Sequence, residues 1–148
     1  MSSEVMRVHY TPDGDTLRCF RTVTENGVTR AEEVRIRLAY IDAPEIGHAE
    51  CRAYAIRARA YLRRLLYVGE PVETRILGHD QYGRFIAEVI RLRDYGNCGL
   101  RLAHGGYAAL YQCPLVRWEY QAAQEIAQQK RLGIWRNPGP WQTPWLTR

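Results

Sequence analysis

Two turn-forming dipeptides divide the first forty residues of the chain into short alternating segments. Asp13-Gly14 and Asn26-Gly27 each lie between runs in which apolar and polar residues alternate. Asp-Gly and Asn-Gly pairs in this setting are among the strongest sequence signals for a β-hairpin, and Asn-Gly favours the type I′ turn. Residues 7–41 are therefore predicted to form antiparallel strands.

The strand pattern ends near Pro44, and a helical pattern follows it. In the last strand we expect Arg35 and Arg37 on one face, opposite the apolar residues Val34, Ile36, Leu38 and Tyr40. Over residues 50–67 the apolar positions recur at helical spacing, at Ala55, Ala58, Leu62 and Leu65. The arginines of this helix, Arg57, Arg63 and Arg64 among them, form a solvated face or extend a phosphate-binding track.

The second half of the chain predicts two further strands and two further helices. Strand patterns return at residues 71–77 and 84–92, and helical patterns cover 98–104 and about 114–131. In the last helix, Trp118, Ala122 and Ile126 are expected to face the core, and Trp135 is expected to anchor the core beyond it. Residues 137–148 form a tail rich in proline and tryptophan.

Five strands in hairpins with three helices predict an α+β fold. The strands have the number expected of a five-stranded OB-type Greek-key barrel. The length, 148 residues, fits one domain covering 1–148, with its core at about 7–136.

The charge of the chain is positive and is carried by arginine. The net charge is +5, and Lys130 is the single lysine. Arginine binds phosphate in a bidentate manner that lysine does not match, which fits a nucleic-acid partner. A general preference for arginine over lysine explains the composition equally well, so charge alone does not decide the function.

Several classes of protein are excluded or disfavoured. The only serines are Ser2 and Ser3, there is no Gly-Lys dipeptide, and the histidines lack HExxH spacing. Serine-nucleophile, P-loop and zinc-hydrolase chemistry are therefore not expected. The cysteines form no CxxC pair; Cys51 and Cys113 form a bridge in an oxidising compartment or stay free thiols. No apolar run could span a membrane, so we expect no membrane partner.

The N-terminal residues, MSSEVMRVHY, contain no apolar segment of the signal-peptide type. As the sequence stands, a cytoplasmic protein is expected, and a secreted or periplasmic one if a signal has been removed.

Carboxylates gather at two places that a barrel would bring together. Asp15 directly follows the first turn, and Asp42 and Glu45 flank Pro44 at the end of a strand. Convergent like charges are costly, and a hard divalent cation such as Ca²⁺ or Mg²⁺ relieves them. Two simpler interpretations stay open: Asp13-Gly14 is only a turn, and the second acidic group only caps a helix.

Five segments of the chain, in order, resemble the staphylococcal-nuclease-like, or thermonuclease, family. They are Asp13-Gly-Asp15-Thr16-Leu, Val34-Arg-Ile-Arg37-Leu-Ala-Tyr-Ile-Asp42-Ala-Pro-Glu45, Asp80-Gln-Tyr82-Gly-Arg84, Ala103-His-Gly-Gly106-Tyr-Ala and Leu132-Gly-Ile-Trp135. The resemblance covers roughly residues 8–136. It implies an OB-type barrel with three helices and a calcium-dependent phosphodiesterase that acts on DNA and RNA.

The resemblance also implies a role for particular residues. Asp15, Asp42 and the carbonyl of Ala43 match the calcium ligands, and Glu45 matches the general base. The two arginines that bind phosphate match Arg37 and Arg84. Taken without the family, Arg37 could instead be a surface residue and Arg84 a salt-bridge partner at a loop end.

Tyr82 matches a tyrosine near the substrate, and Tyr111 is the nearest candidate for a second one. The family often has threonine at the position of Ala43, and a lysine-rich loop that some relatives carry after Pro44-Glu45 is absent. We expect DNA and RNA substrates, with single strands preferred, and a monomeric protein. The competing hypotheses are a catalytically silent OB-type module that binds nucleic acid or protein, and a processing factor that serves one partner.

Overall fold

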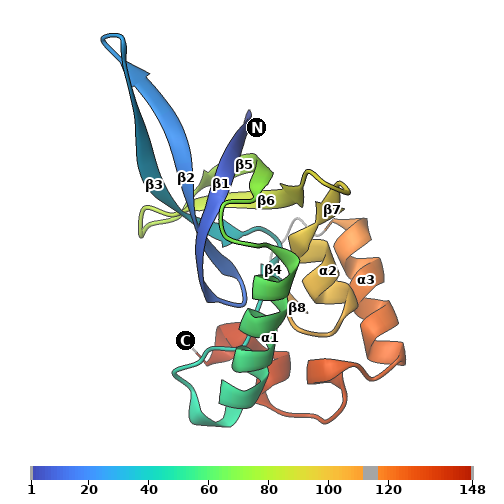
Figure 1. Ribbon diagram of the computed structural model, residues 1–148. Helices are drawn as coiled ribbons and strands as arrows, with labels where there is room; N and C mark the ends of the chain where they lie inside the picture. The colour runs from blue at the N-terminus through green and yellow to red at the C-terminus, as the bar shows by residue number, and fades with distance from the viewer. Residues whose placement is uncertain (1, 112–116, 148) are drawn as a thin grey trace.

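The computed structural model describes residues 2–111 and 117–147 and contains a small β-barrel flanked by helices (Figure 1). Its main strands are β1 (Ser2–Asp13), β2 (Thr16–Glu25), β3 (Val28–Leu38), β5 (Pro71–His79) and β6 (Phe85–Arg91). They pair in the order β3-β2-β1-β5-β6, and short β7 (Gly96–Asn97) follows β6. A parallel pairing of residues 36–38 with 85–87 joins β3 to β6. The predicted α+β class and OB-type architecture are confirmed.

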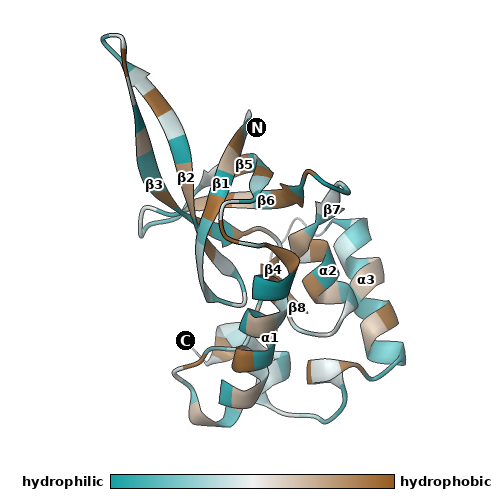
Figure 2. Ribbon diagram, viewed as in Figure 1, coloured by the Kyte–Doolittle hydropathy of each residue, from teal (hydrophilic) through white to brown (hydrophobic). Residues whose placement is uncertain are grey.

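Both predicted hairpins are present. Asn26 and Gly27 have φ values of 51° and 76°, which is the left-handed pair that a type I′ turn needs. Beyond the barrel, β2 and β3 continue as a two-stranded arm that projects from the molecule (Figure 1). Hydrophobic and hydrophilic residues alternate along the strands (Figure 2).

The strand β3 ends earlier than its sequence pattern suggests. The chain leaves the sheet at Leu38 and turns at Tyr40, which has φ 71°. It then forms β4 (Ile41–Asp42), which pairs with β8 (Ala109–Leu110). The turn is stabilised by the Arg37 guanidinium, which donates to the carbonyl oxygens of Leu38 and Ile41 on either side of it. The strand that was predicted to continue to Ile41 therefore ends at Leu38, because the hydrogen bonds of the Arg37 side chain stabilise a turn after it.

The three predicted helices are present as α1 (Arg52–Leu65), α2 (Cys98–His104) and α3 (Trp118–Gln129). The predicted apolar face of α1 is confirmed, because its buried residues are Ala55, Ala58, Leu62 and Leu65. A 3-10 turn, η1 (Ala49–Cys51), precedes α1, and η2 (Gly133–Trp135) follows α3. The predicted start of the last helix near Pro114 lies outside the described residues.

The buried face of α3 differs from the predicted one. It consists of Tyr120, Ala123 and Ala127, whereas Trp118 is 74% exposed. The Tyr120 hydroxyl donates to Glu88 of β6 at 2.6 Å. This buried hydrogen bond turns the helix so that Trp118, Ala122 and Ile126 do not form the core stripe. Trp135 is only partly buried, and its neighbour Ile134 is the core residue.

The C-terminal tail contains two short 3-10 turns, η3 (Pro140–Gln142) and η4 (Pro144–Leu146). The Trp141 ring stacks on Tyr54 of α1 with 4.8 Å between centroids. Gln142 donates to the carbonyl of Ile134 at 2.9 Å. The tail is thus attached to the domain through aromatic and hydrogen-bond contacts.

Cys19, Cys51 and Cys98 are buried free thiols, while Cys113, the possible partner of Cys51, lies outside the described residues. Burial raises the pKa of Cys19 and of Cys98 to about 12. No helix within the described part of the chain is long and apolar enough to cross a membrane.

Gly106 brings two distant segments of the chain together by backbone contact. Ile134 donates to the carbonyl of Gly106 at 2.9 Å. A Cβ on Gly106, which has φ +74°, would lie 2.3 Å from the carbonyl oxygen of Leu132. Gly106 therefore closes the junction between α2 and the segment after α3.

Gly106→Ala is expected to destabilise the fold strongly. The left-handed conformation alone costs roughly 1–3 kcal/mol for a non-glycine residue, and the clash with backbone adds to it. Gly69→Ala is the control, because Gly69 has φ +89° but open space around it. Urea unfolding should show a larger decrease in free energy for Gly106→Ala, and equal decreases would contradict the packing argument.

Candidate active site

Arg37 lies at the centre of the predicted site. It is on β3 and only 8% exposed. Its Nη2 donates to the Asp42 carboxylate at 3.0 Å and lies 3.6 Å from the Asp15 carboxylate. Because two acidic side chains surround one guanidinium, the alternative of Arg37 as a surface residue is wrong.

The first turn holds Asp15 against the segment after β4. One carboxylate oxygen of Asp15 accepts from the backbone N–H of Ala43 at 2.9 Å, and the other accepts from the Thr16 hydroxyl at 3.1 Å. The turn packs on α1 so closely that a Cβ on Gly14 would lie 2.5 Å from the Ala58 Cβ. The Asp-Gly-Asp sequence is therefore a turn that also places a carboxylate, and it is not only a turn.

The two acidic groups expected to hold a metal are brought together by these contacts. Asp42 is fully buried and Asp15 is 6% exposed, and both contact Arg37. Within residues 2–111 and 117–147, no group of three or more His, Cys, Asp or Glu side chains could hold a metal ion. Two carboxylates with backbone and water oxygens form a hard donor set, which is the type that Ca²⁺ takes. Asp15, Asp42 and Ala43 fit such a set in donor chemistry.

Asp80 binds Arg84, the second predicted phosphate-binding arginine. The sequence patterns do not assign this role to Asp80. One of its carboxylate oxygens accepts from the backbone N–H of Tyr82 at 2.9 Å and of Arg84 at 3.0 Å. The other accepts from Arg84 Nε at 2.6 Å. The loop therefore fixes the direction of the Arg84 side chain. Arg84 does form an ion pair at the loop end, and its phosphate-binding role stays a prediction.

The carboxyl of Asp80 keeps its charge. Burial raises its pKa, but the hydrogen bonds from Arg84 and Tyr82 outweigh that effect, so the pKa lies below its usual value. Gly83 with φ 81° closes the turn around the carboxylate. An aspartate followed within a few residues by glycine is the signal that could have identified this turn.

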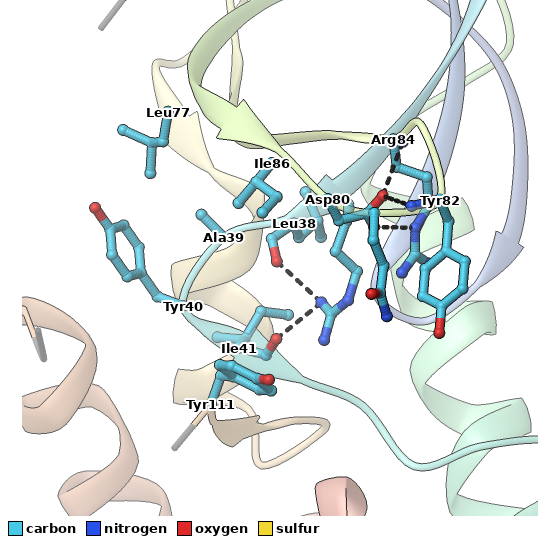
Figure 3. Close-up of a pocket in the computed structure, with 12 residues that line it drawn as sticks. Leu38, Ala39, Tyr40, Ile41, Leu77, Asp80, Tyr82, Arg84, Ile86 and Tyr111 are labelled. Carbon is cyan, nitrogen blue, oxygen red and sulfur yellow. Dashed lines mark hydrogen bonds and ion pairs between the residues drawn. The ribbon is translucent and has the colours of Figure 1, made fainter. Parts of the chain in front are cut away.

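A pocket of about 530 Å³ connects both arginines and both predicted substrate tyrosines (Figure 3). Arg37 and Arg84 line it together with Tyr82 and Tyr111. Tyr82 is 63% exposed and Tyr111 is 44% exposed, so their rings are accessible from solvent. Backbone pairing positions Tyr111, whose N–H donates to the carbonyl of Tyr40 at 2.7 Å. The structure thus gathers four of the predicted site residues around one cavity.

The pocket lining does not include the predicted metal ligands Asp15, Asp42 and Ala43, which adjoin it through Arg37, and it does not include Glu45. Glu45 follows Pro44 in the segment between β4 and η1, is partly buried, and its carbonyl accepts from the N–H of His48. Its charge contributes to the raised pKa of Cys51, after burial and the charge of Glu50. The catalytic role of Glu45 stays a prediction.

The fold and these side chains define an OB-type barrel that combines a buried acidic pair with a pocket lined by arginines. The chain belongs to the family described as staphylococcal nuclease homologue, whose model matches residues 35–137. The matched range includes most of the predicted site residues, from Arg37 to Tyr111. Asp15 precedes it and joins the site through its contact with Ala43.

The curated relatives include proteins named as endonucleases. The chain is 30% identical to a probable endonuclease LCL3 of Leptosphaeria maculans over 128 residues, covering 80% of this chain and 43% of the relative. It is 28% identical to a protein of the same name from Pyricularia oryzae, covering 93% and 63%. An uncharacterized endonuclease of Haemophilus influenzae is 31% identical, with coverage of 90% and 67%. The chain spans about half the length of the fungal relatives.

Proposed function

We propose that this protein is a calcium-dependent nuclease that hydrolyses phosphodiester bonds of DNA and RNA with little sequence specificity. The observation that carries the proposal is that Arg37 belongs both to the acidic cluster and to the pocket. Its guanidinium contacts the buried acidic pair and also lines the pocket that contains Arg84. A phosphate bound between the two arginines would therefore lie beside Asp15 and Asp42.

In this proposal each side chain has one task. Asp15, Asp42 and the carbonyl of Ala43 would hold Ca²⁺, which when bound would supply a Lewis acid for a phosphoryl oxygen. Arg37 and Arg84 bind the phosphate and stabilise the negative charge that grows in the transition state. Glu45 accepts the proton of the attacking water.

The exposed rings of Tyr82 and Tyr111 support a single-stranded substrate. Aromatic side chains beside a basic pocket can stack on unpaired bases whatever their identity, and each stacked base contributes roughly 1–3 kcal/mol. In a duplex the bases are already stacked on one another, so the rings have less to bind. We therefore propose a preference for single strands or frayed ends.

The test is hydrolysis of single-stranded DNA and of RNA by the purified protein, with calcium and then with EDTA. Cleavage with calcium that EDTA abolishes is the expected result. A second readout is thermal unfolding, where calcium binding to the native state raises the midpoint. Asp42→Asn should lose that rise while it stays folded.

Binding without cleavage in calcium, magnesium and manganese alike would overturn the proposal. The protein would then be the silent binding module, with the acids and arginines kept but no reaction. A trace contaminant is excluded when Arg84→Gln, purified in parallel, is about 10²–10³ slower, as expected when a charge-stabilising donor is removed.

A further inference from the structure

The first helix carries a strong positive charge that the active site does not use. The 14 residues of α1 read RAYAIRARAYLRRL, with five arginines and no acidic residue. Four of its side chains, Tyr54, Arg57, Tyr61 and Arg64, follow one another at intervals of three, four and three. This spacing places them on one face of a helix, and we call them the tyrosine–arginine ladder.

Aromatic contacts hold the ladder in a fixed arrangement. The Arg57 guanidinium carbon lies 5.5 Å from the Tyr54 ring centroid, and that of Arg64 lies 5.7 Å from the Tyr61 ring. Tyr61 also stacks on Tyr107, with 4.2 Å between centroids and 11° between planes. An arginine that stacks on an aromatic ring keeps its N–H groups directed outward in the plane of the guanidinium, where they can bind an anion.

A second hollow lies beside the ladder. It has a volume of about 520 Å³, and Tyr54, Arg57, Tyr107 and Arg136 are among its lining residues. It shares no lining residue with the pocket of Arg37 and Arg84. Arg57 of α1 and Arg136 of the segment after η2 thus line the same hollow. Two guanidinium groups around one concave surface favour a phosphate group.

We propose that the tyrosine–arginine ladder and Arg136 form a second contact site for the phosphate backbone of a nucleic-acid strand, outside the active site. The inference rests on the proposed nucleic-acid substrate. The rise of a helix is 1.5 Å per residue, so Arg57 and Arg64 are separated by roughly 10 Å along the axis. Such a span reaches several phosphates of one strand, so only longer substrates would use it.

The helix also connects this surface to the active site. Ala58, which follows Arg57, packs under the Gly14 turn that carries Asp15. Arg57 is therefore next in the chain to the helix residue that supports the turn of the acidic pair. The ladder would raise the affinity for long strands without taking part in the reaction.

The experiment compares Arg57→Gln/Arg136→Gln with Arg18→Gln/Arg30→Gln. The control removes the same charge from strands β2 and β3, where both arginines are about half exposed. Binding of a labelled 24-nucleotide single strand is measured in EDTA at several salt concentrations. Arg57→Gln/Arg136→Gln, called the ladder variant below, should bind about tenfold more weakly. The slope of log binding constant against log salt concentration should become less steep by about 1.4, which is 0.7 for each phosphate that the variant no longer neutralises. The control should change less than twofold.

A tetranucleotide, too short to reach the ladder, should be hydrolysed by the ladder variant at the parent rate. Equal thermal midpoints for both variants exclude misfolding. The proposal is overturned if the ladder variant binds the 24-nucleotide strand as tightly as the control. It is also overturned if polyglutamate competes as well as the nucleic acid, because the surface would then bind acidic polypeptides.

The ladder and the proposed function can fail separately. If the parent protein cleaves long strands, and Arg57→Gln/Arg136→Gln binds and cleaves them equally well, only the second contact site is refuted. Parent protein that binds through the ladder but never cleaves refutes the nuclease and keeps the second site.

Discussion

Arg37→Met is expected to abolish hydrolysis and also to lower the stability of the fold by about 3–5 kcal/mol, as is typical for breaking a buried ion pair. The Asp42 side chain is fully buried and the Asp15 side chain is 8% exposed, and Arg37 contacts both. Methionine fills much of the same volume but leaves two carboxylates without that cation. Urea unfolding measures the decrease in free energy, and the rate of DNA cleavage measures the decrease in activity.

Two variants separate the electrostatic cause from a packing defect. Arg37→Met/Asp42→Asn should recover part of the stability, because one buried charge is neutralised, but it should not recover hydrolysis. Arg84→Met should lose hydrolysis with a smaller decrease in stability, since Arg84 is 23% exposed and its partner Asp80 is 16% exposed. An Arg37→Met protein with the parent's unfolding free energy would show that the buried cluster does not stabilise the fold.

Glu45→Gln is expected to reduce the rate of hydrolysis by about 10²–10⁴ and to leave the fold intact, the range typical of a positioned general base. Glutamine has nearly the same shape but cannot accept the proton of the attacking water. Glu45 is only partly buried, so the substitution should change the unfolding free energy little. Single-turnover cleavage of a short strand at saturating calcium measures the chemical step.

The matched control is Glu50→Gln, which removes the same charge from the same connecting segment at an exposed position. It should keep the parent rate. Full activity of Glu45→Gln would remove Glu45 from the mechanism. Binding of uncleaved strand by Glu45→Gln should persist, because the arginines that bind phosphate are unchanged.

Local sequence patterns predict the parts of this molecule whose structure depends on near neighbours. The type I′ turn at Asn26-Gly27 follows from turn chemistry, and the buried face of α1 follows from the spacing of Ala55, Ala58, Leu62 and Leu65. The α3 face could not be predicted in this way. Its orientation depends on the hydrogen bond between Tyr120 and Glu88, 32 residues apart, which competes with the apolar spacing.

The candidate site shows the same division. The residue types and the resemblance to the family are present in the sequence, so the acids, arginines and tyrosines could be named from it. The sequence allows a salt bridge of Arg84 but does not name Asp80 as its partner, although both lie within one loop. A side-chain ion pair leaves no period in the sequence that would single out the partner.

By itself, the sequence determined the hairpins, the helical face of α1 and the set of charged side chains available for chemistry. Only the tertiary structure decided which of these side chains meet. Asp15 reaches the N–H of Ala43 across 28 residues, and Arg37 turns inward between two carboxylates and folds the chain at Tyr40. The physical reason is that turns and helical faces arise from neighbouring residues. A buried cluster of charges is stable only when closure of the barrel brings its distant members into contact.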